Sequence, residues 1–192
     1  MGGVIVRDFD VAPELLRLLG FSEVSFAALA PDLRRELSRH GRGEISESEF
    51  WAGYSRITGK TVPPHNGSLL GKFFHPKTDE PTVQIAKELK SRGLRVVTGT
   101  NVIDAHYTIH QNLGQYAIFD RVYASFLMGI AKPDSAFFSH ILNEEGIQAD
   151  EAFFTDDIET NVKAAEAAGL RAFVYSGASA LREQLASLGI RL

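Results

Sequence analysis

AFFTDDIETNVKAAEAAG, at residues 152–169, combines a short apolar run, an acidic turn and a helical segment. Residues 152–155 have the length of a buried strand, and residues 161–168 are rich in Ala, Lys and Glu and precede a glycine, which is typical of a helix end. Two adjacent carboxylates, Asp156 and Asp157, lie between them. In an open α/β sheet, ligands bind beyond the carboxyl ends of the strands, and paired carboxylates there favour a hard cation such as Mg²⁺. The alternative is an acidic turn that caps the helix.

Further strand-like runs alternate with helices on both sides of this unit. Residues 94–97, 119–124 and 171–175 are the expected strands, and helices are expected before, between and after them. This alternation predicts βαβ units and a parallel sheet with helices on both faces, as in a Rossmann-like α/β fold. The apolar opening MGGVIV, residues 1–6, is expected to supply the first strand of the same sheet.

The region between the first strand and the other strands is helical in character. Leu29, Leu33 and Leu37 recur at helical spacing, and Ser46 with Glu49 forms a capping-box pattern. A last short helix of this block is expected at residues 68–74. The sequence therefore predicts an α/β core made of residues 1–9 and 78–192, with a helical cap of residues 10–77 inserted after the first strand.

Composition limits the classes of function. The 192 residues are 44% hydrophobic, which is normal for a globular protein, and the net charge is −4. Because there is no basic block, we expect no nucleic-acid partner, and because no apolar run reaches about 20 residues, we expect no membrane span. The absence of cysteine excludes disulfides and thiol catalysis and fits a cytoplasmic protein. Oligomeric state is not indicated.

Three polar turns follow apolar strands and are expected to meet at one edge of the sheet. Thr98 and Gly99 offer a hydroxyl and backbone N–H groups for a phosphate oxygen. Lys132 stands near a helix start, where the helix dipole favours anions rather than a lysine, which hints at an anionic ligand. Each turn alone has an ordinary explanation as solvated surface, but hydroxyl, lysine and paired acids in this order form an uncommon set.

At these positions the chain resembles the haloacid dehalogenase superfamily, in particular its capped phosphatase branch. The resemblance rests on four segments, VVTGTN at 96–101, GIAKPDSAFF at 129–138, the acidic segment at 152–169, and GRGEISESEF at 41–50, which is similar to a cap segment of sugar-phosphate phosphatases. The resemblance implies a phosphatase that acts on a small phosphorylated metabolite through an aspartyl-phosphate.

The resemblance also implies roles for individual residues. Asp156 and Asp157 would hold Mg²⁺ together with the carbonyl of Gly2, and Asn161 would brace the acidic loop. Thr98 and the Gly99 N–H would hold phosphate, and Lys132 would bridge the phosphate and the nucleophile. Mg²⁺ and a lysine are a common means of neutralising a phosphoryl group in transfer. The cap would close over the substrate and exclude water.

The first motif departs from the family pattern. Residues 1–6 match it from its second position onward, so the nucleophilic aspartate would stand directly before Met1, and Gly2 would replace the usual acid/base. The competing interpretation uses Asp8 and Asp10, which have the right spacing but place Arg7 in a buried central strand. A start without this aspartate predicts loss of most of a central strand, which favours an incomplete sequence record over an evolved pseudoenzyme.

Other functions and sites remain open at this stage. The alternatives are a haloacid dehalogenase, which needs no Mg²⁺; a signalling receiver domain, in which the acidic pair would come early; and a non-catalytic binder of a phosphorylated ligand. His106 and His110 have the i, i+4 spacing of metal ligands but lack the intervening glutamate of a zinc protease motif, so we interpret them as ordinary helix-surface histidines.

Overall fold

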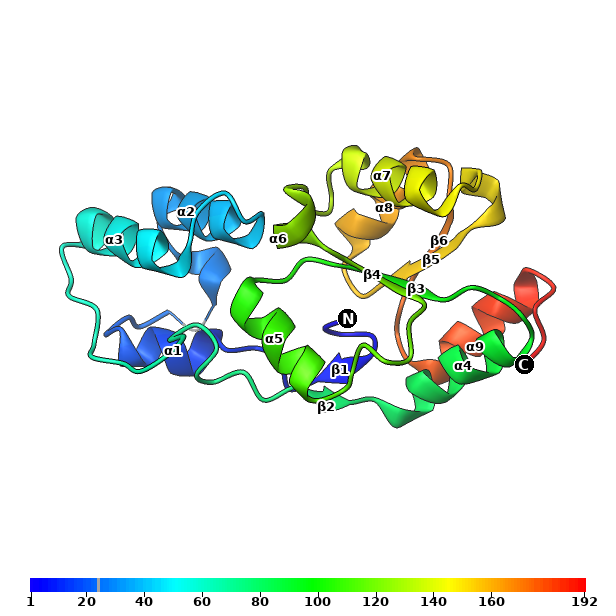
Figure 1. Cartoon of the computed structure of the whole chain (residues 1–192), viewed down its shortest axis with the longest axis horizontal. Coiled ribbons are helices and arrows are strands. Elements are labelled where there is room, and N and C mark those ends of the chain that lie inside the picture. Colours follow the sequence, from blue (N-terminus) through cyan, green and yellow to red (C-terminus); the bar gives the residue numbers. More distant parts are fainter. Residues whose placement is uncertain (24) are drawn as a thin grey trace.

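The computed structural model of the chain describes residues 1–23 and 25–192. It is a mixed α/β structure, seen in Figure 1, which confirms the predicted fold class. The elements in chain order are β1 (Val6–Arg7), α1 (Ala12–Leu18), η1 (Phe26–Ala28), α2 (Pro31–Gly41), α3 (Glu47–Thr58), β2 (Lys77–Thr78), α4 (Glu80–Ser91), β3 (Val97–Thr100), α5 (Asp104–Asn112), β4 (Arg121–Ala124), α6 (Ser125–Met128), α7 (Ser135–Glu145), η2 (Ala149–Glu151), β5 (Phe153–Asp156), α8 (Glu159–Ala167), β6 (Arg171–Val174) and α9 (Ala178–Ser187).

The parallel strands form two separate pairs instead of one continuous sheet. β3 pairs in parallel with β4 in the register Thr98↔Val122, and β5 pairs in parallel with β6 in the register Thr155↔Phe173. Within residues 1–23 and 25–192, no strand hydrogen-bonds to both pairs. The second edges of β3 and β5 therefore have no ladder partner in the described part of the chain.

The prediction that residues 1–6 form a strand of this sheet is wrong. The N–H groups of Ile5 and Val6 both donate to the carbonyl of Met1, which closes the segment into a tight turn. Gly3 allows this turn because its φ of +76° lies in the left-handed region that glycine tolerates. Only Val6–Arg7 is extended, and it pairs antiparallel with Lys77–Thr78. β1 and β2 are thus the paired entry and exit of the helical region.

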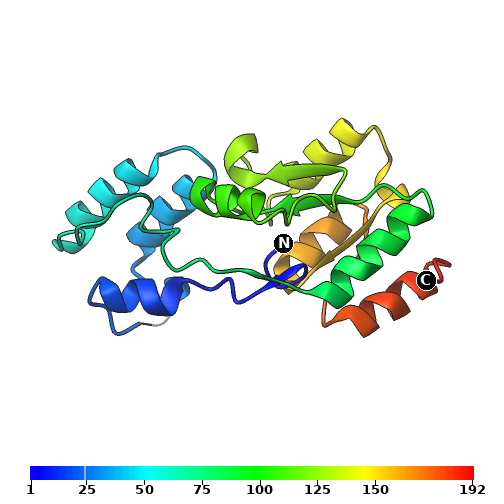
Figure 2. The ribbon, with the colours of Figure 1, turned by 60° about the horizontal axis from the view of Figure 1, so that its bottom comes forward.

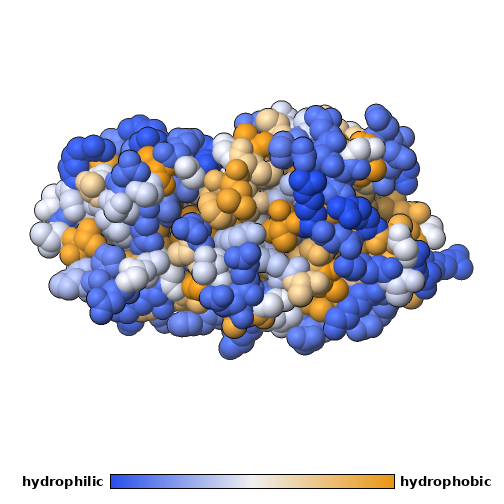
Figure 3. Space-filling model, in the orientation of Figure 1, coloured by the Kyte–Doolittle hydropathy of each residue, from blue (hydrophilic) through white to orange (hydrophobic). Residues whose placement is uncertain are grey.

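Residues between β1 and β2 form a helical block with its own hydrophobic cluster. Leu15, Leu33, Trp51 and Tyr54 are among the buried residues that hold α1, α2 and α3 together. Figure 2 shows this block beside the α/β region, joined to it by two connecting segments. Much of the face in Figure 3 is hydrophilic, with hydrophobic side chains gathered near the middle. The described residues between 12 and 74 contain no strand.

The short helix predicted at residues 68–74 is also wrong, because this segment forms bends and turns. The N–H groups of Leu69 and Leu70 donate to the carboxylate of Glu47 at 2.8 and 3.1 Å. Glu47 also accepts from the indole N–H of Trp51 at 2.9 Å. A side chain at the start of α3 thus replaces the helical hydrogen bonds of this segment and anchors it to the block.

Two hydrophobic clusters cover different sides of the strands. Helices α7 and α8 pack together through a cluster that includes Phe137 and Val162 (Figure 1). Helices α4 and α9 contribute Ile85 and Leu185 to a second cluster, which also buries Val6. Among the described residues, no helix is both long and apolar enough to cross a membrane.

Candidate active site

Lys132 joins the carboxyl ends of β3 and β5. Its Nζ donates to the Gly99 carbonyl of β3 at 2.9 Å and to Asp156 Oδ2 of β5 at 2.6 Å. The backbone of Lys132 is held in turn by the Asn101 side chain, whose Oδ1 accepts from the Lys132 N–H at 2.9 Å and whose Nδ2 donates to its carbonyl at 2.8 Å. The three polar turns, which contain Gly99, Lys132 and Asp156, therefore meet at the ammonium group of Lys132, as predicted.

Asp156 is a buried carboxylate with a full set of donors. Besides Lys132, Asn161 Nδ2 and the Ile158 N–H donate to its Oδ1, both at 2.9 Å. Burial alone would raise the pKa of Asp156, but the charge of Lys132 and these hydrogen bonds outweigh burial and hold the pKa below its ordinary value. Asp156 is therefore ionised at neutral pH, and Asn161 lies where the sequence predicted a brace for the acidic loop.

Asp157 has a different electrostatic environment from its neighbour. Partial burial, followed by the charge of Asp156, raises the pKa of Asp157. Its carboxylate lies against the backbone of the N-terminal turn, since a Cβ on Gly3 would fall 1.9 Å from Asp157 Oδ2. The adjacent α-amino group of Met1 is buried; burial and the charge of Lys132 lower its pKa to about 5. Asp157 and the start of the chain thus share one site.

The structure separates the two threonines of VVTGTN. Thr98 is buried inside β3 and does not line the cavity at Lys132, whereas Thr100, at the end of the strand, lines it together with Asn101. Gly99 packs so closely on α7 that an added Cβ would fall 2.8 Å from Phe137 Cε1. The polar groups that reach the cavity therefore come two residues later than Thr98. The predicted strand ended at Val97, but threonine favours strands, and β3 continues to Thr100.

Asp8 and Asp10 lie in different environments. Asp8 has a positive φ of 54° and an exposed ion pair with Lys77 at 2.9 Å, outside the residues that line the cavity. Asp10 lines the cavity, but its Oδ1 accepts the Ala12 N–H at 2.9 Å at the start of α1. Asp10 is consequently the member of this pair that faces the site.

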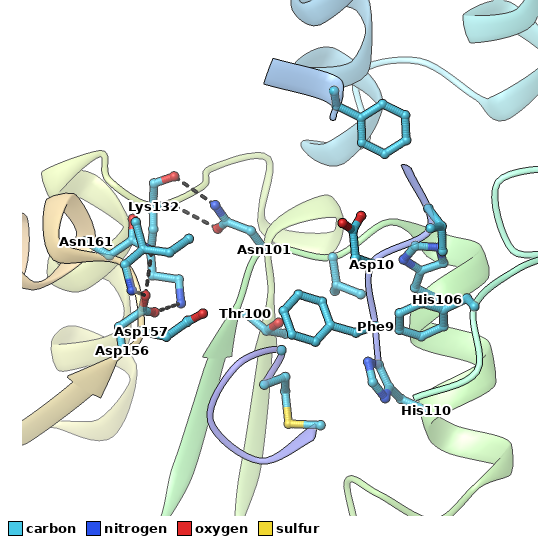
Figure 4. A pocket seen from close by; sticks show the side chains of 17 residues that line it. Phe9, Asp10, Thr100, Asn101, His106, His110, Lys132, Asp156, Asp157 and Asn161 are labelled. Carbon is cyan, nitrogen blue, oxygen red and sulfur yellow. Dashed lines mark hydrogen bonds and ion pairs between the residues drawn. The ribbon is translucent and has the colours of Figure 1, made fainter. Parts of the chain in front are cut away.

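A cavity of about 300 Å³ unites these groups with aromatic side chains from other elements. In Figure 4, Lys132, Asp156, Asp157 and Asn161 lie toward one end, Phe9, His106 and His110 lie toward the other, and Thr100 lies between. Gly2 also lines the cavity.

The two histidines are held by partners other than a metal ligand set. His106 stacks on Phe74 with ring centroids 3.7 Å apart, and its Nε2 donates to the Leu70 carbonyl at 3.0 Å. His110 is bonded to Gln115 at 2.6 Å. In the described ranges, no group of three or more His, Asp or Glu side chains suited to a metal ion is present. The sequence interpretation of the two histidines as helix-surface residues is wrong for His110, which is buried, and His106 is half-buried.

Comparisons with known proteins identify the family of the chain. The family of haloacid dehalogenase-like hydrolases matches residues 12–169. A sesquiterpene phosphatase of Aspergillus oryzae is 30% identical over 157 residues, which cover 73% of this chain and 79% of the phosphatase.

Two solved structures have the same fold. A HAD-like family hydrolase of Porphyromonas gingivalis superposes with a TM-score of 0.76 at 19% identity, covering 98% of this chain and 93% of that one. A HAD family enzyme of Bacteroides thetaiotaomicron, in complex with magnesium and inorganic phosphate, has a TM-score of 0.70 at 22% identity, covering 92% and 91% of the two chains. Since the family match extends over most of the sequence and carries the acidic loop and Lys132, the chain belongs to the haloacid dehalogenase-like hydrolases.

Proposed function

We propose that the protein is a Mg²⁺-dependent phosphatase that acts on a small phosphorylated metabolite through an aspartyl-phosphate. The observation that carries the proposal is the buried Lys132–Asp156 pair at 2.6 Å, with the carboxylate of Asp157 beside it. A lysine and two acids at the ends of parallel strands supply opposite charges for a phosphate and a cation. The phosphatase among the relatives supports the same reaction class.

Asp156, Asp157 and the Gly2 carbonyl are the proposed Mg²⁺ ligands. The fit rests on chemistry: Asp157 carries a raised pKa because it is partly buried beside Asp156, and a cation relieves that repulsion. Two carboxylates and a carbonyl are hard oxygen donors, and Mg²⁺ commonly retains several waters besides one or two carboxylates. When bound, the ion would neutralise phosphate charge. Asn161 keeps Asp156 oriented through its 2.9 Å hydrogen bond.

Lys132, Thr100 and Asn101 are the proposed phosphate-binding residues, with the predicted Thr98 and Gly99 in supporting positions. Thr100 and Asn101 line the cavity, and the Asn101 side chain holds the backbone of Lys132. Thr98 remains in the strand interior, and the Gly99 carbonyl accepts from Lys132. In this proposal Lys132 attracts the phosphate and Thr100 orients one of its oxygens.

We place the nucleophilic aspartate at the residue position that would precede Met1. The buried α-amino group of Met1 is near enough to Lys132, Asp156 and Asp157 for their charges to shift its pKa, so a residue joined to it would lie among the same groups. The edges of β3 and β5 that have no ladder partner among residues 1–23 and 25–192 offer ladder positions for a preceding strand. The helical block, residues 10–77, is the proposed cap that closes over the substrate.

The test is hydrolysis of p-nitrophenyl phosphate with and without Mg²⁺. We compare the chain as printed with two versions extended before Met1 by the same five apolar residues, ending in Asp or in Asn. The Asp extension should give Mg²⁺-dependent turnover, whereas the Asn extension should fold equally well without turnover, since only a carboxylate can form the acyl-phosphate. Turnover by the unextended chain that Asp10→Asn or Asp8→Asn abolishes would place the nucleophile at that residue instead.

A second comparison separates the two threonines. Thr100→Val in the active version should reduce kcat/KM by about 10-fold or more, the scale of one lost hydrogen bond to a charged group, and Thr98→Val should have a much smaller effect. Equal losses of kcat/KM in both variants would show that Thr100 is not the threonine that binds the phosphate.

The family match excludes the signalling receiver domain, and the other two alternatives predict different results. A haloacid dehalogenase would release halide without Mg²⁺, and a non-catalytic binder would bind inorganic phosphate with Mg²⁺ while the Asp extension remained inactive. The acidic pair favours the phosphatase over the dehalogenase, because two adjacent carboxylates serve a cation.

A further inference from the structure

The cavity at Lys132 continues into a larger space along the helical block. The first cavity has a volume of about 300 Å³ and the second about 900 Å³, both within the usual range for small-molecule sites. The residues that line both are Val11, Phe26, Asn101, Val102, His106 and Lys132. A ligand whose phosphate lies at Lys132 can therefore extend into either space along the same wall.

The shared wall has three apolar residues, Val11, Phe26 and Val102, beside the polar Asn101, His106 and Lys132. The apolar residues that line the first cavity include Phe9, Val11, Phe26, Phe74, Val102 and Ile158. Two of them are partly accessible, since Phe9 is 37% and Ile158 53% exposed. Large apolar side chains that stay accessible in a concave site mark a surface that an apolar ligand group covers.

Three polar side chains of the first cavity, those of Asp10, His106 and His110, are already hydrogen-bonded inside the protein. Their partners are the Ala12 N–H for Asp10, the Leu70 carbonyl for His106, and Gln115 for His110. Burial lowers the pKa of His106 to about 4, so this side chain is uncharged at neutral pH. A ligand rich in hydroxyl groups would have to displace these internal hydrogen bonds to satisfy its own.

We infer that the substrate is the phosphomonoester of a hydrophobic alcohol, whose hydrocarbon part lies between Phe9, Phe26 and Ile158 while its phosphate lies at Lys132. This inference rests on the proposed function and names its substrate class. It disfavours a sugar phosphate, since Phe9, Phe26 and Ile158 offer no hydrogen bonds to the hydroxyl groups of a sugar. The competing possibility is a second anionic group, because Arg34 and Arg42 line the larger cavity. Arg42 is already bonded to Glu44 at 2.6 Å and Ser38 at 2.7 Å.

The experiment measures binding of non-hydrolysable phosphonates to the full chain in the presence of Mg²⁺, by calorimetry. The probes are methyl-, n-hexyl- and n-decylphosphonate, a hexose phosphonate, and a hexyl-1,6-bisphosphonate. Affinity should rise at least 10-fold from methyl to hexyl, because each buried methylene contributes about a fourfold gain and burial of two of the five added methylenes is enough. The hexose phosphonate should bind no better than methylphosphonate.

Ile158→Thr is the matched test of the wall. Ile158 is the N-cap residue of α8, a position where threonine is well tolerated, so this variant should fold. The ratio of hexyl to methyl affinity should fall several-fold in Ile158→Thr. Val174→Thr, a similar change at a 41% exposed position outside both cavities, should leave the ratio unchanged.

The outcomes separate this inference from the proposed function. Binding of methylphosphonate without any gain for longer chains, or tighter binding of the hexose phosphonate or bisphosphonate, overturns the hydrophobic substrate and leaves the phosphate site standing. If inorganic phosphate and every phosphonate fail to bind with Mg²⁺, both the proposed function and the inference are overturned.

Discussion

Removing the positive charge of Lys132 should destabilise the protein by about 3 kcal/mol. Lys132 Nζ lies 2.6 Å from Asp156 Oδ2, and the two side chains are only 6% and 8% exposed. Breaking a buried ion pair by removing one partner typically costs about 3–5 kcal/mol, because the other charge stays buried. We take the lower value for Lys132→Met, since Asn161 and the Ile158 N–H still donate to Asp156. For a chain of this length, about 3 kcal/mol corresponds to a fall in Tm of about 6–12 °C.

The assay is thermal and urea unfolding of four proteins: the original chain, Lys132→Met, Asp156→Asn and the double variant. Because the double variant leaves no uncompensated charge, its loss of stability should be smaller than the sum of the single losses by about 2 kcal/mol. Lys163→Met is the control, since the Lys163–Glu159 pair has a similar separation of 2.7 Å but is exposed, and it should leave the midpoint nearly unchanged. Additive single losses, or a loss below about 1 kcal/mol for Lys132→Met, would refute the reasoning.

Two further predictions concern the N-terminal turn and the buried histidine. Gly3→Ala should lower the free energy of unfolding by clearly more than about 1–2 kcal/mol, the cost of an alanine at positive φ, because the new Cβ would fall 1.9 Å from Asp157 Oδ2. The same contact should weaken Mg²⁺ binding, measured by calorimetry. Gly59→Ala, at φ +69° with nothing within 4 Å, gives the backbone cost alone, and equal effects would contradict the contact. The pKa of His106 is lowered from 6.5 to about 4, so between these pH values the unfolded chain binds a proton that the folded chain does not. The free energy of unfolding should therefore fall as the pH decreases from about 6.5 toward 4. For this group the fall is at most about 1.4 kcal/mol per pH unit. Urea unfolding should show a weaker dependence of stability on pH across this range in His106→Gln than in the original chain; the same dependence in both proteins would assign it to other groups.

The meeting of Lys132 with Asp156 could be predicted from the sequence because it follows from topology. Both residues lie at or beyond the carboxyl ends of predicted strands, and the carboxyl ends of parallel strands face one way. The strand boundary at Thr98 could not be predicted in the same way. A Thr-Gly-Thr-Asn run is compatible with a turn by composition, and only the pairing of β3 with β4, with Thr100 opposite Ala124, extends the strand to Thr100.

The other differences arise from long-range contacts that have no local signal. Residues 68–74 have a helical composition, yet Glu47 binds the N–H groups of Leu69 and Leu70 from 22 and 23 residues away. The apolar opening of the chain has strand-like composition, but it folds back because its N–H groups find the carbonyl of Met1. Local propensity was overridden in both segments by the hydrogen-bonding partners that were available.

The division of the strands into two parallel pairs has a consequence for how the molecule moves. Among the described residues, main-chain ladders bind β3 to β4 and β5 to β6 and none joins the two pairs. In the chain as printed, each pair is therefore expected to open as a local unit with its own protection against amide hydrogen exchange, and the proposed preceding strand would join them. Lys132 touches both pairs, through Gly99 on one and Asp156 on the other. An anion that binds the Lys132 ammonium group therefore weakens the contacts between the two strand pairs and also occupies the cavity. In such a molecule, occupancy of the cavity and the relative mobility of the two halves are thermodynamically coupled.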